Sequence, residues 1–297
     1  MRILFVTSNR LGDAVLSTGL LDHLIRTHPD ARFTVVCGPV AEGVFARMPN
    51  RERTIVVDKL PLRLHWLPLW TSIVTIRWDL VVDIRGSTIA WMVPTRRRAV
   101  MRRRSGHKTV QLAAILGLEP PPLPVTWTAA ADRARAAELL PPGRPLIGLS
   151  PTANWTGKVW PADRFAVLFD ELASRKLSGA IPVIFAGPGE AERIMAEPLL
   201  AALPNAIDLV GRLSLPEVAA CLARCDLFVG NDSGLMHLAA AAGTPTLGLF
   251  GPTPASEYAP SGPRAAVALS RSSSMEELSV EAAFAAATGL ITQLELV

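Results

Sequence analysis

The chain has 297 residues, 49% of them hydrophobic and 19% charged, which is ordinary for a water-soluble α/β protein and long enough for two domains. No apolar stretch is long enough for a transmembrane helix, and the apolar run after Met1 is too short for a signal peptide, so we expect a cytoplasmic protein. Residues 1–140 carry 20 Lys and Arg against 11 Asp and Glu, whereas residues 141–297 carry 10 against 15. The basic half predicts an acidic partner: a phosphorylated lipid or sugar, an anionic membrane surface or nucleic acid.

The first half of the chain alternates apolar strands with helical segments. A strand at 3–7 leads through a polar loop into a helix that begins near Gly12 and Asp13 and ends before Pro29. Further strands are expected at 33–37, 55–57 and 80–84. Because these strands are apolar throughout rather than alternating, they predict a parallel sheet covered by helices on both faces.

Asp13 is a candidate for chemistry because it follows the carboxyl end of the first strand. As an acid in the first turn of a helix, it has a purely structural interpretation, worth roughly 1 kcal/mol through the helix dipole. Its functional interpretation is a general base that takes a proton from an incoming hydroxyl group. The nearby glycines do not form G-x-G-x-x-G, which weakens the case for an NAD-dependent oxidoreductase.

Two further segments of the first half concern a partner. Segment 60–70 is apolar, interrupted by prolines and rich in tryptophan, which suits either a bilayer interface or a buried connector. Arginine triplets at 96–98 and 102–104 favour either a solvated surface or contact with a phosphorylated acceptor or anionic headgroups. Aromatic residues are too sparse for a surface that binds single-stranded nucleic acid, so we expect no nucleic-acid partner.

The proline-rich segment 141–145 is the best linker, and it predicts domains at 1–142 and 143–297. The pattern then restarts, with a helix near 163–175 and strands at 146–150, 182–186, 227–230 and 246–250. We therefore predict two doubly wound, Rossmann-like α/β domains that hold a substrate in the cleft between them. The stretch 275–294 predicts one or two helices, which pack either on the C-terminal domain or back on the N-terminal domain.

The stretch at 231–245 is the most informative in the chain. An apolar strand ends in a tight polar turn, and an alanine-rich helix capped by Asp232 or Ser233 begins at once. The backbone amides at such a helix start, aided by the helix dipole and the small residues Ser233 and Gly234, form an anion site suited to phosphate. The alternative is an ordinary capped turn between a strand and a helix.

Three other side chains in the second half have both structural and functional interpretations. Lys158, in the polar loop after the strand at 146–150, is either a solvated charge or, with the helix start at 232–235 as its neighbour, a phosphate clamp. Glu190 either starts a helix or accepts hydrogen bonds from ribose hydroxyls. His237 on the alanine-rich helix is more typical of a packing residue than of a ligand.

Several alternative chemistries lack their sequence motifs. The chain contains no H-E-x-x-H, no Walker A motif and no G-x-S-x-G elbow. Its cysteines, Cys37, Cys221 and Cys225, lack metal-ligand spacing and are expected to be buried thiols. No Asp-x-Asp triplet is present to hold a divalent metal, so we expect neither a metal nor another cofactor.

Taken together, these motifs resemble the bacterial lipopolysaccharide heptosyltransferases, glycosyltransferase family 9. The resemblance covers nearly the whole chain and is most specific over residues 231–254; its other parts are Ile3–Asp13, Asp79–Ser87, 150–161 and 213–219. It implies a GT-B fold of two Rossmann-like domains, with the acceptor on the first and the nucleotide-sugar on the second. The implied reaction is metal-independent transfer of a heptose from ADP-heptose to a saccharide of the lipopolysaccharide core.

The same resemblance assigns roles to individual residues. Asp13 matches the general base, and Lys158 matches the lysine that binds the donor diphosphate. Leu213 matches a position that packs on adenine, and Glu190, with Glu192 as a rival, matches the ribose-binding acid. The remaining predicted substrate-binding residues are Gly12, Asn154, Asp232, Ser233, Gly234, Leu235 and His237.

The resemblance also implies partners. We expect a phosphorylated or acidic glycolipid acceptor and peripheral contact with the inner face of the cytoplasmic membrane. The alternatives are a related transferase with a different nucleotide-sugar donor, and a non-catalytic protein that binds sugar nucleotides.

Overall fold

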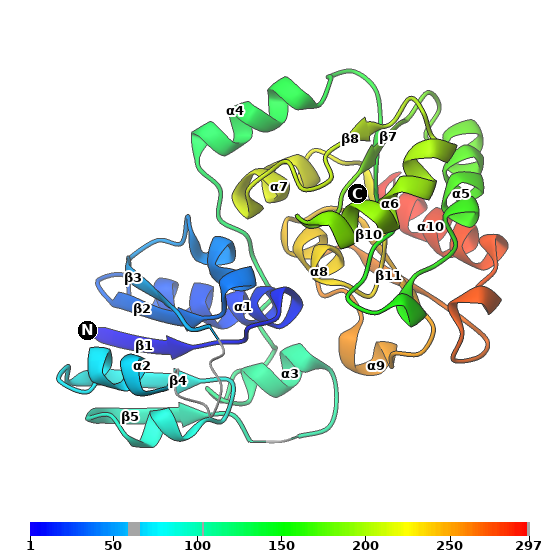
Figure 1. Ribbon diagram of the computed structural model, residues 1–297. Coiled ribbons are helices and arrows are strands. Elements are labelled where there is room, and N and C mark those ends of the chain that lie inside the picture. The colour runs from blue at the N-terminus through cyan, green and yellow to red at the C-terminus, as the bar shows by residue number, and fades with distance from the viewer. Residues whose placement is uncertain (59–65, 103, 296–297) are drawn as a thin grey trace. The chain divides into compact units, whose positions relative to one another are not determined.

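The computed structural model describes residues 1–58, 66–102 and 104–295. The chain forms two compact units, Met1–Trp127 and Thr128–Val297, each with its own sheet and helices (Figure 1). The segment 60–70 is described from residue 66 onward, and Arg103 lies outside the described residues.

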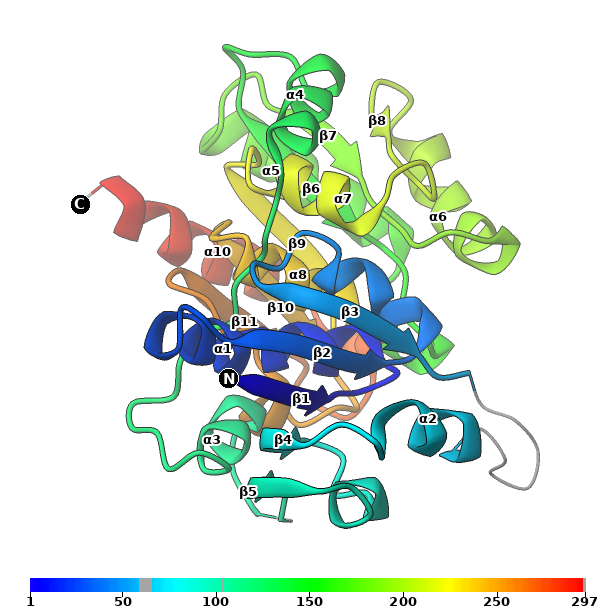
Figure 2. The same cartoon turned by 90° about the vertical axis from the view of Figure 1, so that its left-hand side faces the viewer.

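The sheet of the first unit is parallel throughout. Its strands are β1 (Arg2–Val6), β2 (Arg32–Cys37), β3 (Arg51–Val56), β4 (Trp78–Asp83) and β5 (Thr95–Val100). Their order across the sheet is β3-β2-β1-β4-β5, with β1 paired to both β2 and β4 (Figure 2). The order reverses direction at β1, so the loops after β1 and β4 leave toward opposite faces, which is where ligands bind in such sheets.

Both faces of this sheet are covered by helices. The first-unit helices are α1 (Leu11–Thr27), η1 (Pro39–Phe45), α2 (Trp66–Ile73), η3 (Thr88–Trp91) and α3 (Lys108–Ala113). Helix α1 contacts η1 and α3, whereas α2 and η3 bury Leu69 and Ile89 in a cluster with Leu4 and Val81 of the strands. Burial on both faces explains why the strands show no polar alternation.

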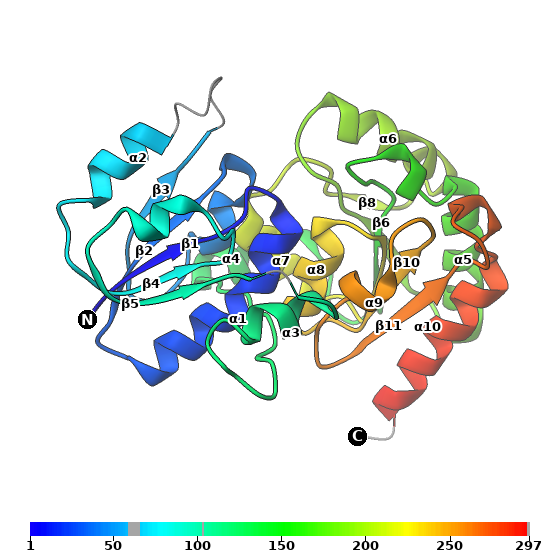
Figure 3. The same cartoon turned by 90° about the horizontal axis from the view of Figure 1, so that it is seen from below.

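The second unit repeats this design with six parallel strands. They are β6 (Leu146–Ser150), β7 (Ile181–Ile184), β8 (Ile207–Asp208), β9 (Leu227–Asn231), β10 (Thr246–Phe250) and β11 (Ala265–Leu269). Their order is β11-β10-β9-β6-β7-β8, so the direction reverses between β6 and β9 (Figure 2). The C-terminal helix α10 (Val280–Glu295) lies beside α5 (Ala162–Arg175) and β11 (Figure 3). The predicted α/β class with two doubly wound parallel sheets is confirmed.

Two layers of helices enclose the second sheet. The longer helices are α5 (Ala162–Arg175), α6 (Glu190–Ala202) and α10 (Val280–Glu295), and the remaining ones are α4 (Ala130–Leu139), η4 (Thr156–Lys158), α7 (Leu215–Leu222), α8 (Gly234–Ala241), α9 (Ala255–Tyr258) and η5 (Met275–Glu277). Helices α5, α6 and α10 share one hydrophobic core with the strands, and α4 packs on α7. The C-terminal helix α10 thus belongs to the core of the second unit, into which it buries Ala283, Ala287 and Leu290.

The boundary between the units differs from the expected one at 142/143. Residues 128–142 belong to the second unit, because α4 packs on α7 and the Arg224 guanidinium donates a hydrogen bond to the carbonyl of Leu140 at 3.2 Å. The proline-rich segment 141–145 is therefore the connection from α4 to β6 within this unit. Proline and glycine mark a break in regular structure, but they do not distinguish a domain linker from an ordinary loop.

The structure also bears on two predictions from composition, the burial of the cysteines and the lack of a membrane-spanning helix. Cys37, Cys221 and Cys225 are buried free thiols, as expected. In residues 1–58, 66–102 and 104–295, no helix combines the length and the apolarity needed to cross a membrane.

Candidate active site

The second unit gathers polar side chains where β6 and β9 end. These strands are neighbours, with Ser150 paired in register to Gly230, and each is followed by a polar loop. Because their connections diverge at this switch point, the loop after Ser150 and the turn after Asn231 border the same crevice position. Two segments 80 residues apart in sequence are thereby joined into one candidate site.

An ion pair lies at the centre of this site. The Lys158 ammonium, at the end of η4, is 2.6 Å from Oδ2 of Asp232, in the turn between β9 and α8. The lysine side chain is 22% exposed and the aspartate side chain 8% exposed. Asp232 therefore holds a positive charge beside the start of α8 and leaves it accessible to a ligand. The sequence analysis placed Lys158 beside the helix start at 232–235, and this contact with Asp232 confirms that the two segments are neighbours.

Asn231 fastens the Lys158 loop to the end of β9. Its side-chain carbonyl accepts a hydrogen bond from the amide of Trp160 at 3.1 Å, and the buried indole of Trp160 donates to the carbonyl of Leu278 at 2.8 Å. The loop is thus anchored two residues after Lys158. Asn154, near the other end of the same loop, is exposed.

Three buried polar atoms at this site have no hydrogen-bond partner among the described residues. They are Oγ of Ser150, Nδ2 of Asn231 and Oγ of Ser233. An unsatisfied buried polar group costs roughly 1–3 kcal/mol, so such groups are normally paired. Their concentration at the ends of β6 and β9 and at the start of α8 indicates a polar ligand.

Helix α8 starts without a side-chain cap, contrary to expectation. Ser233 occupies the cap position in extended geometry, but its hydroxyl makes no capping hydrogen bond, and the carboxylate of Asp232 is engaged with Lys158. The amides at the start of any helix have no partner within that helix, so those of Gly234 and Leu235 suit an external anion. His237, one turn further, is buried.

The loops at the ends of β7 and β8 hold the predicted nucleoside contacts. Glu190 is the exposed first residue of α6, whereas Glu192 accepts a hydrogen bond from the amide of Gly187 at 3.3 Å. Leu213 is half-buried and directly precedes the capping box of α7, in which Glu217 accepts from both the amide and the hydroxyl of Ser214. The choice between Glu190 and Glu192 as a ribose ligand stays open.

In the first unit, Asp13 lies at the corresponding switch point. It stands with Gly12 in the first turn of α1, which begins at the carboxyl end of β1. The hydroxyl of Ser8 donates a hydrogen bond to Oδ2 of Asp13 at 3.3 Å, and the side chain is half-buried. A carboxylate held this way keeps an oxygen available for a substrate hydroxyl, as a general base requires.

The loop after the neighbouring strand β4 supplies a cation beside Asp13's loop. Arg85 donates from Nη1 to the side-chain oxygen of Asn9 at 3.1 Å, and its guanidinium lies 5.3 Å from the ring centre of Trp66. Buried Asp83 shapes this loop by accepting from the amides of Arg85 and Ser87, both at 2.8 Å. Burial raises the pKa of the Asp83 carboxyl, and the hydrogen bonds from Ser87 and the backbone oppose that effect.

Sequence reasoning did not assign site roles to several of these residues. Arg85, Ser150, Asn231 and Trp160 belong to recognised motifs, yet their partners are distant in sequence. Their position at strand ends was the available signal, because the carboxyl ends of parallel strands meet at one edge of a sheet.

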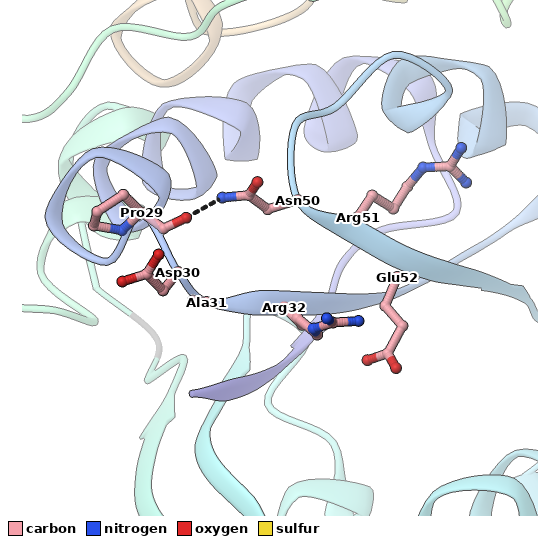
Figure 4. Close-up of a pocket in the computed structure, with 7 residues that line it drawn as sticks. All are labelled: Pro29, Asp30, Ala31, Arg32, Asn50, Arg51 and Glu52. Atoms are coloured by element: carbon pink, nitrogen blue, oxygen red, sulfur yellow. Dashed lines mark hydrogen bonds between the residues drawn. The ribbon is translucent and has the colours of Figure 1, made fainter.

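A hollow elsewhere in the first unit does not compete with this site. It encloses about 500 Å³ and is lined by residues from Pro29 to Arg32 and from Asn50 to Glu52 (Figure 4). It lies at the amino ends of β2 and β3, whereas Asp13 follows the carboxyl end of β1. Arg51 already donates to the carbonyl of Ala46 at 3.1 Å, and the Asn50 side chain donates to that of Pro29 at 2.6 Å. Two of its polar side chains are thus engaged by backbone carbonyls.

Two doubly wound sheets with polar loops at both switch points define a protein of the nucleotide-binding α/β class. The family model "Glycosyltransferase family 9 (heptosyltransferase)" matches residues 87–287. Lipopolysaccharide heptosyltransferase 1 of Pseudomonas aeruginosa is 30% identical over 292 residues, covering 85% of this chain and 79% of the relative. Lipooligosaccharide heptosyltransferase 2 of Haemophilus influenzae is 26% identical over 305 residues, covering 88% and 86%. The chain belongs to glycosyltransferase family 9, the heptosyltransferase family, and is a glycosyltransferase.

Solved structures share the fold. A family 9 glycosyltransferase of Veillonella parvula superposes with a TM-score of 0.84 at 24% identity, covering 98% of this chain and 97% of that one. The ADP-heptose heptosyltransferase II of Escherichia coli superposes with a TM-score of 0.78 at 21% identity, covering 99% and 100%. The GT-B fold predicted from the resemblance is confirmed.

Proposed function

We propose that this enzyme transfers a heptose from ADP-heptose to a saccharide of the lipopolysaccharide core or a similar acceptor, with inversion and without a metal ion. The observation that carries the proposal is the Lys158–Asp232 pair at the start of α8, surrounded by unsatisfied buried polar atoms. An ammonium and free helix amides together match a diphosphate leaving group. An E. coli heptosyltransferase of the same fold has been solved with ADP, which supports an ADP-sugar as the donor.

The proposed step is a direct displacement at the anomeric carbon. Asp13 accepts the proton of the acceptor hydroxyl while the oxygen of that hydroxyl bonds to the anomeric carbon. The bond from the carbon to the diphosphate oxygen breaks, and its electron pair leaves with ADP. Lys158 and the amides of residues 233–235 stabilise the negative charge that develops on the diphosphate.

Metal independence is supported by the chemistry of the residues. In the described part of the chain, no three His, Cys, Asp or Glu side chains cluster as metal ligands. Lys158 and the start of α8 offer the positive potential that a divalent ion supplies in other transferases. We expect an excess of EDTA to leave the rate of transfer unchanged.

Replacing Asp13 tests the proposed base. Because Asn cannot accept the proton, we expect Asp13→Asn to lower kcat by roughly 100-fold or more while ADP binding stays intact. Asp22→Asn is the matched control, since Asp22 is an acid on the same helix paired with Arg26. Wild-type turnover in Asp13→Asn would refute the assignment of the base.

Replacing Lys158 tests the donor site separately. Lys158→Gln keeps a hydrogen-bond donor beside Asp232 but removes the positive charge, so we expect kcat to fall roughly 100- to 1,000-fold and ADP to bind more weakly. Ranking ADP, UDP, GDP and NAD by thermal shift of the wild-type protein then tests the donor, because a ligand at 100 times its Kd stabilises by about 2.7 kcal/mol. A larger shift with UDP or GDP would favour the alternative of a different nucleotide-sugar.

A further inference from the structure

The strongest charge asymmetry in the chain lies outside the site described above. Residues 86–118 contain seven Lys and Arg and not one Asp or Glu. Strand β5, which carries Arg96–Arg98, is the free edge of the first sheet (Figure 2). Arg96 and Arg97 are exposed there, and Arg102 and Arg104 are exposed just beyond the strand. This charge is therefore displayed at one edge of the first unit.

A hollow of about 370 Å³ lies where that edge meets α3 and η3. Arg98, Arg102 and Arg104 line it, together with Gln111 and the ring of Trp91. Arg98 is fixed in place, since it donates to the carbonyls of Ala90 at 2.8 Å and Val93 at 3.1 Å. Its guanidinium also lies 5.5 Å from the ring centre of Trp91. The hollow therefore combines a rigid cationic wall with an aromatic one.

Large apolar side chains project beside these arginines. Trp91 is 65% exposed and Met92 is 54% exposed at the end of η3. Leu67 of α2 is also exposed, and the Trp70 indole, one turn along α2, donates to the carbonyl of Met92 at 2.9 Å. Apolar residues gathered in this way on a soluble protein mark a surface that contacts a partner or a membrane.

We propose that Leu67, Trp91, Met92, Arg96, Arg102 and Arg104 form a lipid-docking surface that binds an anionic bilayer. A bilayer satisfies both halves of this surface: tryptophan and methionine enter the interface, and arginines contact the headgroup phosphates. A small phosphorylated sugar or a nucleic acid would leave Trp91 and Met92 in water. Docking would bring the enzyme to a lipid-borne acceptor, and this use of the surface rests on the proposed function. The binding of lipid itself does not depend on the proposed function.

Sedimentation of the full chain with vesicles tests the proposal without donor or acceptor. We expect binding to vesicles containing phosphatidylglycerol, weak binding to pure phosphatidylcholine, and release as salt rises, because the attraction is screened. Each basic residue near the membrane contributes about five-fold in partition, so Arg102→Ser/Arg104→Ser, which removes two cations that line the hollow beside Trp91, should bind roughly 25-fold more weakly. The control is Lys176→Ser/Arg271→Ser, two exposed cations of the second unit.

A substitution of Met92 tests the apolar part of the lipid-docking surface. Met92→Ser should weaken vesicle binding several-fold, whereas Ile194→Ser, a similarly exposed apolar residue on α6, should have no effect. The ADP thermal shift of each variant reports whether the protein stays folded and keeps its donor site. A variant that loses vesicle binding and keeps the ADP shift supports the surface, whatever the transfer assay shows.

Two results would overturn the proposal. Wild-type binding to anionic vesicles in both Arg102→Ser/Arg104→Ser and Met92→Ser would exclude this surface as the docking site. An arginine variant with the vesicle partition of the wild-type protein but a raised KM for a water-soluble phosphorylated acceptor would instead assign these arginines to acceptor recognition.

Discussion

Asn231 shows how one side chain links the backbone to the chemistry of the donor site. Its carbonyl oxygen holds the amide of Trp160, which positions Lys158, while its Nδ2 is buried without a partner among the described residues. The residue is completely buried at the end of β9. Its amide group therefore secures the lysine loop and keeps a polar atom beside the proposed donor site.

Replacing Asn231 should therefore affect stability and donor binding together. Asn231→Ala leaves the Trp160 amide unpaired, so we expect a loss of roughly 1–3 kcal/mol in the free energy of unfolding and at least ten-fold weaker ADP binding. Thr244→Val is the matched control, because it removes a buried hydrogen bond to the Leu222 carbonyl at the opposite end of the strands. Denaturant unfolding and ADP titration measure both effects, and equal ADP affinity in the two variants would contradict this role.

Among the elements of the second unit, the short helix α7 holds the loop that carries Leu213, a residue of the proposed donor site. Helix α7 begins with a capping box in which the Glu217 carboxylate accepts from the Ser214 hydroxyl at 2.7 Å and its amide at 2.8 Å. These hydrogen bonds, the one from the hydroxyl foremost, lower the pKa of Glu217 below its ordinary value of 4.5. Since Leu213 directly precedes the box, the cap also fixes the predicted adenine contact.

The capping box predicts a pH-dependent stability difference. Glu217→Ala should lower the free energy of unfolding by about 1 kcal/mol at pH 7, in the range of other lost caps. Because the folded-state pKa is depressed, this contribution is present above the ordinary pKa of 4.5 and is lost as the pH falls through the lower folded value. Glu197→Ala, an exposed position of α6, should show no such difference in urea titrations at pH 7 and pH 3.

At the scale of the whole molecule, each unit builds its own core around a doubly wound sheet. The three cysteines lie within these cores as free thiols. Burial raises the pKa of Cys37 to about 12 and that of Cys221 to about 11, and it raises the pKa of Cys225 further. A thiol that is both buried and protonated at neutral pH is a poor nucleophile.

We therefore expect the native protein to resist thiol reagents. At pH 8, Ellman's reagent should react with fewer than one thiol per chain over minutes, and with all three after denaturation in guanidinium chloride. Rapid reaction of a native thiol would show that one of the units opens locally. Saturating ADP should slow any residual reaction of Cys221 and Cys225, because both lie in the unit that carries the donor site.

Local sequence was enough to predict the strand-and-helix alternation, the family and the turn at 231–234. These follow from local signals: apolar runs, helix starts, and small residues where a backbone approaches phosphate. Strand β5 was not predicted, because an edge strand covered in arginines lacks the apolar signature. The segment 128–142 was assigned to the wrong side of the proline-rich loop for a similar reason, since the packing of α4 on α7 leaves no trace in local sequence.

The particular hydrogen bonds between residues distant in sequence depend on the tertiary fold. The pairing of Lys158 with Asp232, the anchor from Asn231 to Trp160, and the bond from Arg85 to Asn9 each join residues more than 70 positions apart. Such contacts depend on the order of strands across a sheet, and that order is set by packing on both faces rather than by any local pattern.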